Sequence, residues 1–188
     1  IAIHNQETPD EVKYGMTQYH QALCECRTIA NKHDMPEHIV VGVVAALSPN
    51  NKWERNVTNA DDLISAFING DHVESVKVST YHTMKAKAWR ILEDMPDYAQ
   101  TKVILNGQKI TCFFENIMGE NTCTIDGHAR NIAYAERIGL TDDKTNIGKK
   151  EYALLQDAYR QAAHQCDIKA YEMQAITWVA WRRIHGIK

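Results

Sequence analysis

The sequence predicts an all-α fold, and three observations lead to that prediction. Apolar residues recur at spacings of three and four along nearly the whole chain, as they do on the buried face of an amphipathic helix. All four prolines fall at the edges of these periodic segments, where proline begins or ends a helix. The tight-turn dipeptide Asn106-Gly107 is not flanked by alternating apolar and polar residues, so we interpret it as a helix-to-helix turn rather than a β-hairpin.

The first half of the chain predicts four helices. Pro9 and Pro36 each stand in the first turn of a periodic segment, where their missing N–H is not needed. A polar turn, Ser48-Pro49-Asn50-Asn51, separates the second helix from the third. Asn69-Gly70 ends the third helix and Pro96 follows the fourth. We therefore expect helices over residues 9–30, 36–47, 52–67 and 81–95.

The second half predicts one short element and four further helices. The short element leads into the turn at Asn106-Gly107, and the helix after that turn continues to Gly119. Asp126 begins the next helix and Gly139 ends it. The expected ranges are 97–103 for the short element and 109–118, 126–138, 151–166 and 170–184 for the helices.

The composition is that of an ordinary globular protein, with 188 residues of which 44% are hydrophobic and 24% charged. This length fits one compact domain or two small lobes. No apolar run approaches the roughly 20 residues of a membrane helix, so we expect no membrane association. Five scattered cysteines argue against a disulfide framework and indicate a reducing compartment, so we expect a cytoplasmic protein. No residues show the spacing of metal ligands, and we expect neither a metal nor a cofactor.

The net charge of −3 does not by itself support nucleic-acid binding, because the neutralisation of phosphates by cationic side chains supplies much of the affinity. Any basic surface must therefore be local. Two stretches are candidates for such a surface, although each alone is typical of a solvated face. They consist of Lys85, Lys87 and Arg90, and of Arg182, Arg183, His185 and Lys188.

Lys109 and Asp126 are the residues that most suggest chemistry. Each begins a predicted helix, and Asp126 follows Lys109 by 17 residues (126 − 109). A helix of roughly ten residues is about 15 Å long, and a reversing loop after it would return Asp126 towards Lys109. Alone, Lys109 is typical of a surface lysine and Asp126 of an N-cap. Together, their order and spacing favour a shared cleft.

This region resembles the helix-hairpin-helix DNA glycosylases, the family of endonuclease III. That family has a glycine-rich hairpin ending in G-x-K, then a helix, then a short loop into V-D-x-H. Gly107-Gln108-Lys109 and Ile125-Asp126-Gly127-His128 match these two motifs. The likeness extends upstream in the right order, through Ile39–Ser48, Ala60–Ile64 and Tyr81–Leu92, and covers about residues 36–140.

The chain departs from the family pattern in two places. The family hairpin carries a second glycine, whereas Val103-Ile104-Leu105-Asn106 precedes Gly107 here. The four-cysteine iron–sulfur loop of some members is absent, since Cys166 is the last cysteine. The chain therefore resembles a divergent, cluster-free member. A phage-type member is an alternative that stays open, and its location would be the host-cell cytoplasm.

The resemblance implies a two-lobe helix-hairpin-helix fold with a central cleft. One lobe would comprise residues 36–119 with the hairpin, and the other residues 1–35 plus 120–188. The cleft between them would hold Lys109 and Asp126. We expect a monomer that binds duplex DNA with one base flipped out of the stack.

The resemblance also implies a mechanism. Lys109 would attack C1′ of the sugar, Asp126 would assist the departure of the base, and a Schiff base would permit strand cleavage as in an AP lyase. Six further residues are candidate DNA contacts. Gly107 and Gln108 would hold phosphate in the hairpin, Asn50 and Asn51 would enter the space left by the flipped base, and His128 and Arg130 would lie beside Asp126.

Several residues have a simpler interpretation. We expect Gly107 to adopt a positive φ angle, which glycine allows. Trp53 falls in register with Val57 and Ala60, so we favour packing over base stacking. Trp178 and Trp181 are likewise assigned to packing.

Two other functions stay open. The first keeps the fold and changes the reaction, as in phage enzymes that flip a pyrophosphorylated hydroxymethyl pyrimidine and replace the leaving group with an amine. The second is a non-catalytic helical module that binds DNA or protein, which the negative net charge favours. The sequence does not reveal which base would be the substrate.

Overall fold

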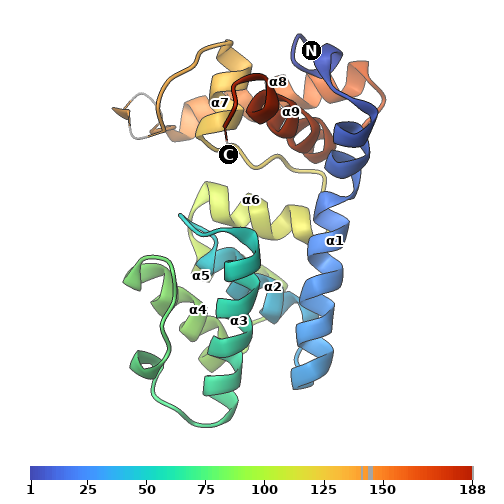
Figure 1. Ribbon diagram of the computed structural model, residues 1–188. Helices are drawn as coiled ribbons and strands as arrows, with labels where there is room; N and C mark the ends of the chain where they lie inside the picture. Colours follow the sequence, from blue (N-terminus) through green and yellow to red (C-terminus); the bar gives the residue numbers. More distant parts are fainter. Residues whose placement is uncertain (141, 144–145, 188) are drawn as a thin grey trace. The chain divides into compact units, whose positions relative to one another are not determined.

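The computed structural model describes residues 1–140, 142–143 and 146–187, and all regular secondary structure in these residues is helical (Figure 1). The all-α prediction is thereby confirmed. The α-helices are α1 (Pro9–His33), α2 (Glu37–Leu47), α3 (Trp53–Ile68), α4 (His82–Asp94), α5 (Tyr98–Leu105), α6 (Gln108–Ile117), α7 (Gly127–Tyr134), α8 (Lys149–Gln165) and α9 (Ala170–Ile184). Two short 3₁₀ helices, η1 (His4–Gln6) and η2 (Val73–Ser75), were not expected from the periodicity.

Helix α7 is shorter than the sequence predicts. It ends at Tyr134 rather than near Ile138, because Ala135 adopts a left-handed conformation with φ 53°. The Asn131 side-chain amide then donates a hydrogen bond to the Ile138 carbonyl at 2.7 Å. Apolar spacing alone does not reveal such an ending, since Ile138 still falls on the helical period.

Contacts within the chain define two compact units. The terminal unit consists of Ile1–Tyr19 and Gly119–Lys188, and the middle unit of His20–Met118. The sequence predicts a lobe of residues 36–119, whereas the middle unit begins at His20, so its first boundary differs from the prediction and lies inside α1. The lobe assignment as such stays a prediction.

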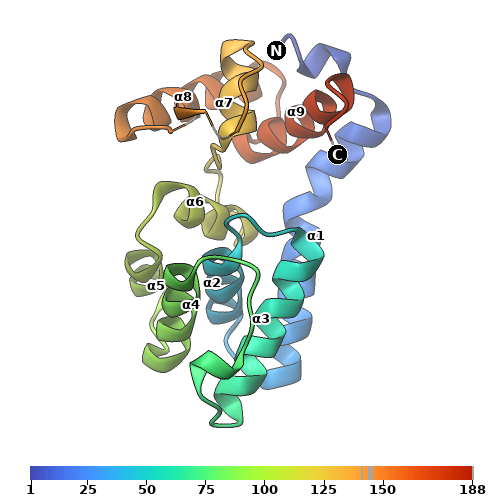
Figure 2. The same cartoon turned by 60° about the vertical axis from the view of Figure 1, so that its left-hand side comes forward.

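The middle unit is built around α2 (Figures 1 and 2). Helix α2 packs against α3, α4, α5 and α6, and all nine residues from Ile39 to Leu47 are buried. A helix that is apolar on every side must be covered on every side. Gly42 permits this close packing, since a Cβ atom there would lie 2.7 Å from the Thr101 methyl group of α5.

An ion-pair clamp joins α1 to α3 in the middle unit. The Lys32 amine lies 2.7 Å from one oxygen of Asp61, and the His33 ring lies 2.6 Å from the other. Partial burial alone would raise the pKa of the Asp61 carboxyl, but the hydrogen bonds from Lys32 and His33 outweigh it and lower that pKa. The clamp therefore stabilises the carboxylate form of Asp61.

The terminal unit is organised on α9, which packs against α7, α8 and η1. The first part of α1 also reaches α9. The Tyr19 hydroxyl lies 3.2 Å from the Gln174 side-chain oxygen, and Glu11 pairs with Arg183 at 2.7 Å. Gly15 marks the closest approach, since a Cβ atom there would lie 2.4–2.7 Å from side-chain and backbone atoms of Ile176.

Gly15→Ala is expected to lower the free energy of unfolding by about 3 kcal/mol, the upper end for an overpacked site, because backbone atoms of Ile176 cannot rotate away. In an open helix the same change would stabilise the protein by about 1 kcal/mol. Chemical denaturation measures the sign. Gly139→Ala is the control, because no heavy atom lies within 4 Å of the added methyl group, and an unchanged Gly15→Ala protein would contradict the packing described.

Asp61→Asn is expected to make stability less dependent on acid pH. The lowered pKa means that Asp61 stabilises the fold above about pH 4, and that this contribution is lost as the pH falls through the folded-state value. Thermal unfolding at pH 7 and pH 3 should therefore show a wild-type advantage at pH 7 that shrinks at pH 3. The neighbouring exposed Asp62 supplies the control, Asp62→Asn. An equal advantage at both pH values would count against the clamp.

Candidate functional site

Helices α5 and α6 form a helical hairpin in the middle unit. Helix α5 ends at Leu105, Asn106 adopts a left-handed conformation with φ 40°, and α6 begins at Gln108 after the N-cap residue Gly107. The Asn106 N–H closes the turn on the Lys102 carbonyl at 3.1 Å. Two residues therefore reverse the chain between the helices.

The prediction of a positive φ at Gly107 is wrong. Gly107 is extended, with φ −167°, and the left-handed residue of the turn is Asn106. Asparagine tolerates that conformation because its short polar side chain bonds locally. A Cβ atom on Gly107 would meet Ile110 at 3.4 Å, an ordinary contact. Neither the φ angle nor the space around it requires glycine at this position.

Lys109 lies in the first turn of α6, and its side chain is exposed. No hydrogen bond or ion pair joins its amine to another residue in the described part of the chain. The first backbone hydrogen bond of α6 runs from Thr111 to the Gly107 carbonyl at 2.9 Å. The N–H groups of Gln108, Lys109 and Ile110 precede it and so lack a helical acceptor. Amide donors and a lysine amine thus occur together at this end of α6.

The turn after α2 holds its two asparagines differently. Asn50 is exposed with φ 54°, and its amide donates to the Tyr81 hydroxyl, which is also exposed. The Asn51 amide instead points inward, 3.3 Å from the Leu47 carbonyl and 3.4 Å from the Asn59 side-chain oxygen. Asn50 is therefore accessible to a ligand, whereas Asn51 stabilises the end of α2.

In the terminal unit, both carboxylate oxygens of Asp126 are held in place. Asp126 is the N-cap of α7, and Oδ1 accepts a hydrogen bond from the Ala129 N–H at 2.8 Å. Oδ2 accepts a second hydrogen bond from the indole Nε1–H of Trp178 at 3.2 Å. The cap residue is half-buried, and its orientation is fixed from two directions.

The sequence assigns Trp178 to packing, and sequence reasoning missed its hydrogen bond to Asp126. The Arg182 guanidinium lies over its ring at 4.5 Å, and the His128 ring meets it edge-on at 6.0 Å. A cavity of about 300 Å³ adjoins it. Its lining residues are Tyr14, Trp178, Val179, Arg182, Arg183 and Ile187. The sequence indicates that Trp178 and Arg182 share a face of α9, because they lie one helical turn apart. It does not indicate the contact with Asp126, which is 52 residues away.

Arg130 has local partners. Its guanidinium lies 3.3 Å from both Glu136 and Glu151, and stacks over the Tyr134 ring at 4.7 Å. Two carboxylates thus neutralise its charge within the terminal unit. Its predicted contact with DNA stays a prediction, and it requires these pairs to open.

Trp53 packs within the middle unit. Its indole N–H donates to both Glu25 carboxylate oxygens at 3.1 Å, and its ring meets Phe113 edge-on at 6.5 Å. A side chain anchored in this way is not a free stacking surface.

Lys109 belongs to the middle unit and Asp126 to the terminal unit. Each has a defined setting within its own unit, and their pairing stays a prediction. The predicted DNA contacts are divided likewise: Asn50, Asn51, Gly107 and Gln108 are in the middle unit, and His128 and Arg130 are in the terminal unit.

The basic C-terminal stretch is largely engaged within the terminal unit. Arg183 is paired with Glu11, and Arg182 covers Trp178. Lys188 lies outside the described residues.

No group of three or more His, Cys, Asp or Glu side chains among the described residues is placed to hold a metal ion. Within the same ranges, none of the helices combines the length and apolar character needed to cross a membrane.

The model of a family of unknown function, DUF7178, matches residues 1–185. No curated protein and no solved structure matches the chain.

Two substitutions separate the helix cap that Asp126 provides from its negative charge. Asp126→Ala removes the cap and is expected to cost about 1 kcal/mol of stability, whereas Asp126→Asn retains an oxygen for the Ala129 N–H and most of the stability. Chemical denaturation of both variants measures the difference. Equal stability loss in the two would mean that the charge of Asp126 or its hydrogen bond with Trp178, rather than capping, is what stabilises the fold.

Proposed function

We propose that this chain, which belongs to the DUF7178 family, is a DNA base-excision enzyme. It flips a damaged or modified base out of duplex DNA and cleaves its N-glycosidic bond. It also acts as an AP lyase through a Schiff base on Lys109. In this proposal the two units are the two lobes of a helix-hairpin-helix glycosylase fold, and the protein acts as a monomer.

The observation that carries the proposal is the hairpin of α5 and α6 with Lys109 in the first turn of its second helix. Free backbone N–H groups at a helix start are suited to phosphate, because the partial positive charge of the helix end attracts an anion. A lysine next to bound phosphate lies beside the sugar of the same strand. This supports Gly107 and Gln108 as backbone contacts and Lys109 as the nucleophile.

The setting of Asp126 supports its role as the partner carboxylate. Hydrogen bonds from the Ala129 N–H and the Trp178 indole fix its two oxygens. A carboxylate held in this way needs no reorganisation when positive charge develops on the sugar. In the proposed cleft, Asp126 stabilises that charge as the base departs.

The reaction balances with the groups of the chain and DNA. The neutral amine of Lys109 forms a bond to C1′, and the C1′–N bond breaks with its electron pair leaving on the base, which takes up a proton. Ring opening gives a Schiff base between C1′ and the Lys109 nitrogen. Loss of a proton from C2′ then expels the 3′ phosphate by β-elimination.

Borohydride trapping tests the proposal. The protein is incubated with duplex and single-stranded oligonucleotides carrying abasic, uracil, oxidised or hydroxymethyl pyrimidine sites, and a covalent adduct is expected on reduction. Lys109→Gln should abolish the adduct without changing the melting temperature, because the Lys109 side chain has no partner in the described structure. Lys77→Gln, which removes another exposed lysine of the middle unit, should retain it.

Other outcomes redirect the proposal. Free base without an adduct would indicate a glycosylase that uses water and Asp126. A mass change on the base with its glycosidic bond intact would indicate base modification. Neither adduct, free base nor mass change on any of these substrates would overturn the proposal and favour a binding module.

A further inference from the structure

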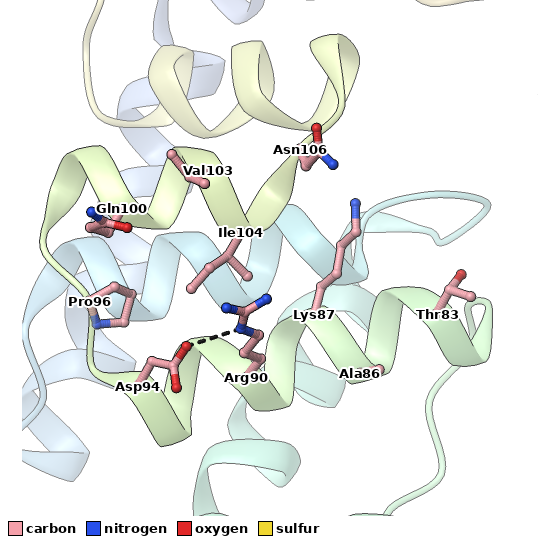
Figure 3. Close-up of a pocket in the computed structure, with 10 residues that line it drawn as sticks. All are labelled: Thr83, Ala86, Lys87, Arg90, Asp94, Pro96, Gln100, Val103, Ile104 and Asn106. Carbon is pink, nitrogen blue, oxygen red and sulfur yellow. Dashed lines mark hydrogen bonds and ion pairs between the residues drawn. The ribbon is translucent and has the colours of Figure 1, made fainter.

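A groove lies between α4 and α5 on the middle unit, with a volume of about 530 Å³ (Figure 3). Side chains of both helices form its walls. They are Thr83, Ala86, Lys87, Arg90 and Asp94 on one side, and Pro96, Gln100, Val103, Ile104 and Asn106 on the other. Asn106 is the turn residue of the hairpin, so the groove ends next to the first turn of α6.

Lys87 is a half-buried cation without a carboxylate partner among the described residues. One of its three N–H groups donates to the Leu105 carbonyl at the end of α5, which leaves two donors for a ligand. Figure 3 shows its amine extending from α4 towards Asn106. Two other lysines of the unit do have carboxylate partners: the Lys85 amine lies 3.8 Å from Glu74, and the Lys102 amine 2.5 Å from Glu115.

Arg90 adds a second cation to the groove. It pairs with Asp94 at 3.0 Å, four residues along the same helix. Both side chains are about half or more exposed, and ion pairs of this kind contribute little to stability. The guanidinium is therefore able to exchange Asp94 for a stronger anionic partner. Lys87, Arg90 and Asp94 together give the groove one excess positive charge.

We propose that this groove binds a phosphate group of a nucleic-acid strand, with Lys87 as its main contact and Arg90 as a second one. The proposal rests on the proposed function for the identity of the ligand, because the groove adjoins the hairpin that would hold DNA. Two phosphates of one strand would then be held side by side, one at the first turn of α6 and one in the groove. The chemistry required is that of a phosphate mono- or diester.

The test is the salt dependence of duplex binding, measured by fluorescence anisotropy between 50 and 200 mM NaCl. Each lost phosphate contact should lower the slope of log K against log salt by about 0.9, so wild type should lose about 3.5-fold more affinity over this range than Lys87→Gln. Arg90→Gln is expected to act in the same direction. The only ion pair of Arg90 among the described residues is a weak surface pair within α4, whereas Lys87 bonds the Leu105 carbonyl of the hairpin. A change in slope for Arg90→Gln therefore does not reflect a disturbed hairpin. Lys77→Gln should leave the slope unchanged.

Asp94→Asn gives a test of opposite sign. Removing the carboxylate releases Arg90 and raises the charge of the groove, so duplex affinity at 50 mM salt should rise. Unchanged slopes in both Lys87→Gln and Arg90→Gln would overturn the inference. So would weaker binding by Asp94→Asn, provided that thermal unfolding shows the variants to be folded.

The source of the phosphate is resolved by a second probe. Amide chemical shifts of Thr83 and Asn106 are followed by NMR during titration with thymidine monophosphate, inorganic pyrophosphate or duplex DNA. If duplex DNA shifts these amides at far lower concentration than the small anions do, the ligand is a nucleic-acid strand, as proposed. If pyrophosphate shifts them and duplex DNA does not, the proposed strand is overturned in favour of a free phosphate. These measurements need no catalysis, so the excision proposal can fail in borohydride trapping while the groove still binds DNA.

Discussion

Helix α2 has no polar face, and the middle unit is arranged to cover it. Because Ile39–Leu47 is apolar around its whole circumference, neighbours are required on every side, and α3, α4, α5 and α6 supply them. Gly42 removes the bulk that would hold α5 at a distance. Burial of this one helix therefore determines where α3, α4, α5 and α6 are placed, and with them the part of the candidate site that lies in the middle unit.

The hairpin and the groove both follow from this packing. Helices α5 and α6 each pack against α2, and the turn at Asn106-Gly107 joins them. Helix α4 rests on α2 as well and contacts α5, and Lys87 joins the two by bonding the Leu105 carbonyl. Lys109 can be exposed because the apolar residues of α6, beginning with Ile110, meet the packing requirement.

Much of this architecture could be predicted, because it depends on local patterns. Three-and-four spacing, prolines at helix starts and the capping preference of Asp126 are each contained in a few adjacent residues. What could not be predicted depends on residues far apart or on backbone detail. Trp178 reaches Asp126 across 52 residues, Asn106 rather than Gly107 takes the left-handed conformation, and a single such residue ends α7 early. The pairing of Lys109 with Asp126 stays a prediction for another reason, since the two residues belong to different compact units.

The discontinuous terminal unit has a consequence for biosynthesis. Its first segment contains Gly15 and Tyr19, whose partners Ile176 and Gln174 are near the other end of the chain. Translation proceeds at roughly 5–20 residues per second, so the amino-terminal turns of α1 leave the ribosome many seconds before α9 exists. The middle unit is continuous in sequence and has no such delay. While α9 is still to be made, the nascent chain is therefore expected to have the internal contacts of its middle unit available, whereas the first turns of α1 lack their partners on α9 and are a suitable substrate for a chaperone.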